Sequence, residues 1–158
     1  DKNSTGLLLL TNDGVWAQKL AHPSFHITKE YVARLDRQLS YEDFARVIKG
    51  AKLEDGFIKP DFIRRTSKRT EILVRIHSGK KHIVRRLFKH FNYNVLELKR
   101  TSFGTVRLDV KPGQWRYLKP EEVANIAQKE NVSMQPFVPR QRTGQQNTSS
   151  SLRTRRTP

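Results

Sequence analysis

The sequence predicts an α+β fold, with a mixed, largely antiparallel sheet flanked by helices. Apolar segments with a two-residue period, typical of strands, alternate with segments of helical period. The two kinds of segment follow no regular strand–helix–strand repeat, which a parallel sheet would require. This patterning fills the chain up to about residue 130, so we expect one folded domain over residues 1–130.

Two strands and two helices are predicted in the first fifty residues. Residues 7–11 are an apolar run that predicts a strand, and a short helix should follow it and end before Pro23. Residues 26–35 alternate between apolar and polar side chains, as a half-buried strand does. Ser40 is placed to cap a second helix that ends at Gly50.

The remaining body of the chain predicts three strands and two helices. The strands are expected over residues 62–66, 71–77 and 94–103, where β-branched and apolar side chains concentrate. One helix follows Gly79, and another opens at Pro120 with acidic residues in its first turn. The apolar stripe of the Gly79 helix recurs at helical spacing and consists of Val84, Leu87, Phe88 and Phe91.

The charge composition indicates a polyanionic partner. The chain has 31 Lys and Arg residues against 15 Asp and Glu residues, a formal net charge of +16. Nucleic acid is favoured over a membrane, because no apolar run approaches the roughly 18 to 20 residues that span a bilayer. The absence of cysteine excludes disulfides and thiolate chemistry. No metal site is expected, because Pro23 breaks the helix that would align His22 with His26.

The end of the chain has no pattern of buried side chains. From Pro136 onward it contains five arginines, no acidic residue and few apolar side chains. Such a segment cannot bury enough surface to offset the entropy of ordering it. We therefore predict a disordered basic tail over residues 131–158, which either binds phosphates without specificity or is an ordinary solvated terminus.

The helix after Gly79 places one arginine at the edge of the core. At 100° per residue, Lys81, Arg85 and Lys89 form a row that borders the apolar stripe. Arg85 should be half-buried, so it needs a carboxylate or phosphate partner. Arg86 points away from the core, toward water or a phosphate.

Three motifs occur in a family-specific order. Asp1 is followed by Ser4 and by Gly6-Leu7, then come Lys29-Glu30-Tyr31 and the Gly79–Phe88 segment with its paired arginines. In these motifs the chain resembles the RsuA-type bacterial ribosomal RNA pseudouridine synthases. The resemblance covers roughly residues 1 to 128 and continues through Leu98-Lys99-Arg100, Gly104 and Lys111-Pro112-Gly113-Gln114-Trp115-Arg116.

The resemblance implies a role for each matching residue. Asp1 would be the catalytic carboxylate and Arg85 its ion-pair partner. Tyr31 would stack on the target base and assist proton transfer, and Ile76 would line the base pocket. The basic residues expected either to contact RNA phosphates or to form ordinary solvated surface are Lys80, Lys81, Arg86, Lys99 and Arg100.

The implied reaction converts a uridine of ribosomal RNA to pseudouridine. It breaks an N-glycosidic bond, turns the uracil within the site and rejoins it through carbon, so it calls for no metal or cofactor. A single carboxylate can do the central work, either by attacking the ribose C1′ or by removing the C2′ proton. An aromatic platform offsets part of the cost of taking the uridine out of its stack.

The resemblance further implies a cytoplasmic, monomeric enzyme whose partner is RNA, with ribosomal RNA foremost. In the family, a small RNA-binding domain and the opening strand of the catalytic domain precede the catalytic Asp. We therefore expect weak or no activity from a chain that begins at Asp1, where a free α-amino group stands beside the carboxylate. The alternative is a non-catalytic basic RNA-binding or ribosome-associated domain. An enzyme should bring Asp1, Tyr31 and Arg85 together at one basic cleft, whereas a mere binder need not.

Overall fold

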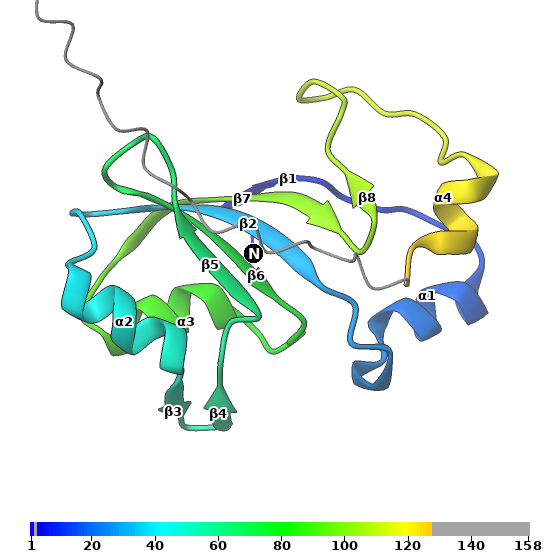
Figure 1. Ribbon diagram of the computed structural model, residues 1–158. Helices are drawn as coiled ribbons and strands as arrows, with labels where there is room; N and C mark the ends of the chain where they lie inside the picture. The colour runs from blue at the N-terminus through cyan, green and yellow to red at the C-terminus, as the bar shows by residue number, and fades with distance from the viewer. Residues whose placement is uncertain (2, 128–158) are drawn as a thin grey trace, which may run out of the picture.

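A computed structural model describes residues 1 and 3–127, which form a central sheet with helices α2 and α3 on one face (Figure 1). The strand order is β1-β7-β2-β6-β5, and β8 also pairs with β7. All pairings are antiparallel except the parallel pairing of β1 with β7. The strands of this sheet are β1 Ser4–Gly6, β2 Lys29–Leu35, β5 Phe62–Arg65, β6 Glu71–Ile76, β7 Val95–Phe103 and β8 Val106–Arg107. The predicted α+β class is confirmed.

Helices α1 and α2 each begin after a residue whose side chain caps them. Asp13 accepts a hydrogen bond from Trp16 N at 2.9 Å, and Ser40 accepts one from Asp43 N at 3.0 Å. Gly50 ends its helix with φ +91°, a conformation that suits glycine. The helices are α1 Gly14–Ala21, α2 Tyr41–Lys49, α3 Ile83–His90 and α4 Pro120–Asn125, with a short 3₁₀ turn at Pro23–Phe25.

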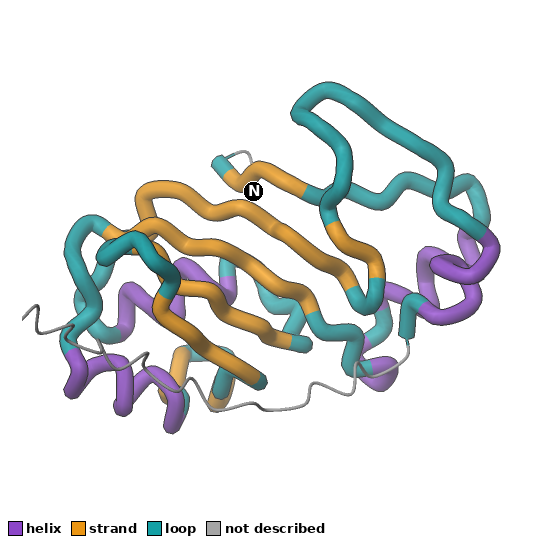
Figure 2. Tube along the Cα trace, turned by 45° about the horizontal axis from the view of Figure 1, so that its top comes forward, coloured by secondary structure: helices purple, strands orange, loops and turns teal. Residues whose placement is uncertain are grey.

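The core lies between the sheet and the pair of helices α2 and α3, as the tube view shows (Figure 2). The predicted apolar stripe of α3 faces this core, and all four of its members are buried. Each fully buried side chain of this size contributes about 1.5 to 3 kcal/mol. The core side chains of the sheet include Ala33, Leu35, Ile72, Val74 and Ile76, and those of α3 are Ile83, Val84, Leu87 and Phe88.

The strand predicted over residues 7–11 is wrong. The first strand, β1, instead spans Ser4–Gly6, and its pairing with β7 ends where Leu7 N donates to Arg100 O at 2.8 Å. Within the described part of the chain, residues 8–11 pair with no strand, and Leu8 and Leu10 are exposed. An apolar run predicts a strand only where a partner strand is present to pair with it.

Three short strands were not predicted from the sequence. The hairpin of β3 Ala51–Leu53 and β4 Gly56–Ile58 forms a separate two-stranded sheet, and β8 extends the main one. Two or three residues are too few to display a period of two. The predicted tail, residues 131–158, lies outside the described residues. Among the residues described, none of the helices combines the length and apolar character needed to cross a membrane.

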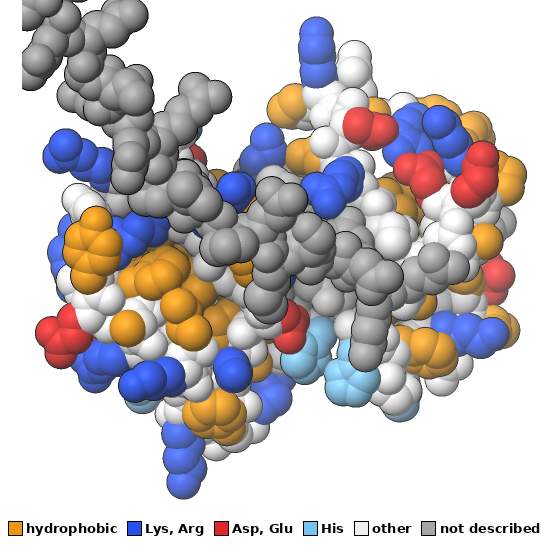
Figure 3. Space-filling model, viewed as in Figure 1, with side chains coloured by type: hydrophobic (Ala, Val, Ile, Leu, Met, Phe, Trp, Pro, Cys, Tyr) orange, Lys and Arg blue, Asp and Glu red, His pale blue; other side chains and the backbone are white. Residues whose placement is uncertain are grey.

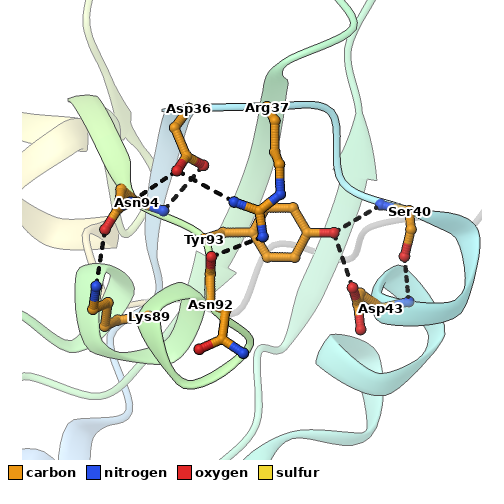
Figure 4. A network of polar contacts seen from close by, with 8 residues as sticks. All are labelled: Asp36, Arg37, Ser40, Asp43, Lys89, Asn92, Tyr93 and Asn94. Atoms are coloured by element: carbon orange, nitrogen blue, oxygen red, sulfur yellow. Dashed lines mark hydrogen bonds and ion pairs between the residues drawn. The ribbon is translucent and has the colours of Figure 1, made fainter.

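A network of polar side chains joins the end of α3 to the start of α2 (Figure 4). Asp36 accepts hydrogen bonds from the backbone N and the side chain of Asn94, at 3.1 and 2.8 Å. The Tyr93 hydroxyl donates to Asp43 at 2.9 Å and accepts from Ser40 N at 3.2 Å. These contacts fix α3 against the sheet at its C-terminal end.

Candidate functional site

A cleft of about 610 Å³ opens at the N-terminal end of α3. One wall consists of residues 4–8, which run through and beyond β1, and the neighbouring parts of β7 and β2 form its floor. The opposite wall is the segment of residues 78–84, which connects β6 to α3 and begins that helix. Chain segments far apart in the sequence therefore meet at this cleft.

Asp1 lines the cleft and is held there by three hydrogen bonds. Its Oδ1 accepts from Asn3 N at 2.9 Å, and its Oδ2 accepts from the Ser4 hydroxyl at 2.9 Å and from Arg85 Nε at 2.6 Å. The bond to Asn3 closes an Asx turn within the loop itself. All three partners donate, which matches an ionised carboxylate. The side chain is only 17% exposed, so its direction is fixed by its surroundings.

Arg85 stands behind Asp1 and is not among the residues that line the cleft. Its Nη1 donates to Val95 O at 2.7 Å and its Nη2 to Asn3 O at 3.0 Å. The guanidinium therefore ties together α3, the start of β7 and the loop that carries Asp1. This geometry makes Arg85 a residue that positions the carboxylate, and its half-buried state matches the place expected from the helical pattern.

Tyr31 lines the floor of the cleft from the middle of β2. It lies opposite Arg100 of β7, so the two side chains share the face of the sheet that α3 covers. The ring is partly buried and packs against the core. The structure thus brings Asp1 and Tyr31 to one cleft, with Arg85 directly behind the carboxylate.

Lys29 also lines the cleft, although the sequence analysis did not assign it a role. It lies two residues before Tyr31 on the same strand, so its side chain projects to the same face. Its Nζ donates to His77 O at 3.3 Å. Burial, followed by the positive charge of Arg100, lowers the pKa of the Lys29 ammonium. The two-residue period of the strand was the signal that could have identified it.

The cleft is strongly cationic. Lys29, Lys80, Lys81 and Arg100 line it, whereas Asp1 is the only acidic residue among its described lining residues. The Asp1 carboxylate is in turn matched by Arg85, and Lys80 Nζ lies 3.7 Å from Asp55 Oδ1, which leaves Lys29, Lys81 and Arg100 as the excess of positive charge. Basic side chains are spread widely on the face drawn in Figure 3 as well. A cleft with this charge suits a ligand that carries phosphates.

Three of the expected substrate-binding residues lie elsewhere. Ile76 is fully buried in the core and does not line the cleft. Lys99 lies between Leu98 and Arg100, which line the cleft, so the pleat of β7 directs it to the other face. Arg86 donates to both carboxylate oxygens of Asp55, at 2.7 and 2.8 Å.

The pairing of Arg86 depends on a hairpin that the sequence did not reveal. Asp55 lies in the turn between β3 and β4, and hydrogen bonds from Arg86 lower the pKa of its carboxyl to about 2. Lys80 Nζ also donates to the backbone oxygen of Asp55. The hairpin therefore engages Arg86, which the helical pattern had placed toward solvent or a phosphate.

The chemistry available in this cleft follows from its contents. A fixed carboxylate faces a space that also holds an aromatic ring and several cations. The carboxylate can attack a carbon or remove a proton, the ring can stack on a base, and the cations can bind phosphates. Together these groups suit a reaction at one nucleotide of a nucleic acid.

Comparison with known proteins is consistent with this chemistry. A family model described as RNA pseudouridylate synthase matches residues 1–90, which include all three residues of the Asp1, Tyr31 and Arg85 set. An uncharacterized RNA pseudouridine synthase of Aquifex aeolicus is 36% identical over 146 residues, which are 90% of this chain and 57% of that protein. Ribosomal large subunit pseudouridine synthase B of Bacillus subtilis is 36% identical, over 80% of this chain and 54% of that protein.

The fold is shared as well. A solved crystal structure of a pseudouridylate synthase superposes with a TM-score of 0.74 at 29% sequence identity, over 80% of this chain and 56% of that one. The chain spans about half the length of the curated relatives it matches. The family match to more than half of the chain, and the shared fold, agree with the cleft and its contents. This chain belongs to the RNA pseudouridylate synthase family.

Proposed function

We propose that this chain supplies the catalytic domain of an RNA pseudouridine synthase that isomerises a specific uridine of ribosomal RNA. The observation that supports this most strongly is the carboxylate of Asp1, fixed by Arg85 at 2.6 Å in a cationic cleft that also contains Tyr31. Reactions of this kind need a catalytic group held close to its productive geometry, and three hydrogen bonds hold this one.

Asp1 acts on the ribose of the target uridine. In one route its carboxylate attacks C1′ as the bond from C1′ to N1 breaks, and in the other it removes the C2′ proton to give a glycal. In both routes the uracil turns and its C5 forms the new bond to C1′, after which the C5 proton leaves. Each route requires an ionised carboxylate that faces the sugar. The fixed position of Asp1 in the cleft therefore supports it as the catalytic group in both routes.

Tyr31 and the cations serve binding and orientation in this proposal. The Tyr31 ring stacks on the extruded uracil, a contact worth about 1 to 3 kcal/mol per base, and lies where it can assist proton transfer. Lys80, Lys81 and Arg100 bind the phosphates that flank the uridine, and Lys29 adds positive charge on the same floor. In a non-catalytic RNA-binding domain, a carboxylate held within the cationic cleft would only repel the phosphates.

Ribosomal RNA is the substrate class that the relatives favour, because one of them is named for the large ribosomal subunit. A protein that modifies bacterial ribosomal RNA works in the cytoplasm, where we place this one. We expect it to act as a monomer and without a cofactor.

The test is tritium release from RNA that carries 5-³H-uridine. The whole gene product that contains this chain is compared with its Asp1→Asn variant, which keeps the shape of the side chain and removes its negative charge. We expect release by the variant to fall to background. Asp13→Asn is the matched control, because an asparagine can still cap α1 and Asp13 lies outside the cleft.

The outcome separates the two candidate functions. If Asp1→Asn and the unaltered protein release tritium equally, Asp1 is not the catalytic group. If the unaltered protein binds ribosomal RNA but releases no tritium, a non-catalytic RNA-binding domain is the correct assignment.

A further inference from the structure

The loop between β8 and α4, residues 108–119, presents two large aromatic side chains that the proposed catalysis does not use. Trp115 is 75% exposed and Tyr117 is 84% exposed. Their rings meet edge to face, with centroids 5.3 Å apart and planes at 89°. The loop projects from the body of the molecule, and Figure 3 shows hydrophobic and basic side chains together on it. Paired exposed rings of this size indicate a binding surface rather than ordinary solvent exposure.

The residue between the two rings anchors the loop. Arg116 donates to both oxygens of Glu122 at 2.7 Å, and its Nε donates to Asp109 at 3.0 Å. The hydrogen bonds from Arg116 lower the pKa of the Glu122 carboxyl to about 2. Both rings therefore start from a backbone that is already fixed, which lowers the entropy lost when a ligand binds.

The loop leaves the sheet beside the cleft. Arg100 O of β7 accepts from Leu7 N at 2.8 Å, and the next carbonyl of the same strand, Thr101 O, accepts from Leu108 N at 2.8 Å. Leu7 and Arg100 both line the cleft. The loop therefore begins one residue along β7 from the cleft wall, at the edge of the sheet where β1 also lies (Figures 1 and 2).

The charge around the rings favours a polyanion. From Arg107 to Glu122 the sequence contains four basic and three acidic residues, so the loop and the start of α4 keep a small excess of positive charge even though Arg116 is matched by Asp109 and Glu122. A ligand that combines negative charge with flat apolar faces is a nucleic acid with unpaired bases, and aromatic rings stack on such bases without sequence preference. An edge-to-face pair leaves ring faces open for that contact.

We propose that Trp115 and Tyr117 form a stacking platform for an unpaired base of the RNA strand that enters the cleft. This inference rests on the proposed function for the identity of the ligand, and it adds a second contact outside the target nucleotide. The platform holds the strand beside the target uridine while that uridine occupies the cleft. Its contribution is to binding, whereas the chemistry remains with Asp1.

The experiment measures binding of two fluorescein-labelled oligomers to the 158-residue chain by anisotropy. One is a single-stranded octauridylate, and the other is an abasic octamer with the same number of phosphates. The double variant Trp115→Leu/Tyr117→Leu is compared with the unaltered chain and with Tyr41→Leu. Tyr41 is the matched control, because it is 82% exposed on α2 and lies outside both the cleft and the loop.

We expect the double variant to bind octauridylate about fivefold to a hundredfold more weakly, the range that loss of base stacking gives. Binding of the abasic octamer should not change, nor should the slope of log affinity against log salt, since no phosphate contact is removed. Tyr41→Leu should bind like the unaltered chain. In a Trp16→Phe background, where Trp115 is the one tryptophan left, octauridylate should quench the emission and the abasic octamer should not.

Two results would overturn the platform. One is equal affinity of the double variant and the unaltered chain for octauridylate. The other is a combination of two observations: the double variant loses affinity equally for both oligomers, and acrylamide does not quench the emission of Trp115 in the whole gene product. The rings would then be buried in a contact between parts of the protein. Neither result depends on catalysis, so tritium release tests the proposed function separately.

Discussion

The two ends of helix α3 use the same kinds of side chain for different purposes. At its C-terminal end, Asp36 and Asp43 are matched by Arg37 and Arg46, at 3.3 and 3.0 Å. At its N-terminal end, the cations that line the cleft outnumber the one carboxylate there. Charged groups that find partners within the fold, as Lys89 does by donating to Asn94 at 3.1 Å, stabilise the fold. A cleft with an excess of one sign is available for a ligand of the opposite sign.

The two ends belong to one short helix and make separate contacts. The network of Figure 4 holds the segment immediately after α3, and Arg85 projects from the first turn of the same helix to hold Asp1. The helix has eight residues and so is about 12 Å long. The contacts of Arg85 with Asp1 and Asn3 involve no residue of that network. Substitutions at the two ends should therefore separate stability from activity.

The largest effect is expected from Gly6→Ala at the cleft end. Gly6 has φ +98°, and an added Cβ would lie 2.2 Å from Arg100 O, so β1 would have to move away from β7. Asp1 would move with it, and a displacement of about 1 Å can cost about a hundredfold in rate. We expect tritium release by the whole gene product to fall at least that far. Gly14→Ala is the control, because an added Cβ there meets no atom within 4 Å.

Arg85→Lys should give the next largest effect. Lysine keeps the charge but cannot reproduce the fork that reaches Asp1, Val95 O and Asn3 O together. We expect kcat to fall by roughly tenfold to a hundredfold, since the carboxylate loses its fixed position. Oligonucleotide affinity should stay near that of the unaltered protein. A loss of affinity with kcat unchanged would show that Arg85 contacts RNA instead.

Tyr93→Phe should destabilise the opposite end and leave the chemistry intact. The change removes a buried hydroxyl that bonds to Asp43 and to Ser40 N. We expect the free energy of unfolding in urea to decrease by about 1 to 2 kcal/mol. Tritium release per folded molecule should be unchanged. A loss of activity as large as that of Arg85→Lys would contradict the division between the two ends.

The smallest expected effect is on the stability of the protein at acidic pH. A hydrogen bond from Tyr93 lowers the pKa of the Asp43 carboxyl below its ordinary 3.8. A carboxyl whose pKa is lowered by folding stabilises the protein above the unfolded value, and this stabilisation is lost as the pH falls through the folded value. Stability measured from pH 6 to pH 2 should therefore fall less steeply in Tyr93→Phe than in the unaltered chain. Parallel curves would show that the Tyr93 contact does not contribute to acid sensitivity.

Local signals in the sequence were sufficient to define several elements. Ser40 and Gly50 delimit α2, and the spacing of Val84 and Leu87 defines the buried face of α3. Spacing along a helix or strand fixes which side chains share a face, so the half-buried place of Arg85 could also be read. The three motifs of the resemblance led to the family, and the match of its model to residues 1–90 confirms that assignment.

Several contacts between side chains that are distant in the sequence are known only from the packing of the whole chain. Residues 8–10 of the Leu7–Leu10 run pair with no strand among the described residues, and the β3–β4 hairpin brings Asp55 to Arg86. The burial of Ile76 and the place of Lys29 on the cleft floor were likewise settled by how the strands pack. Asp1 and Arg85 are 84 positions apart. The family resemblance implied this pair, whereas local periodicity gives the direction of a side chain but not the identity of its partner across the fold. That identity is set by strand pairing and helix packing, which here place one carboxylate, one aromatic ring and an excess of positive charge at a single cleft.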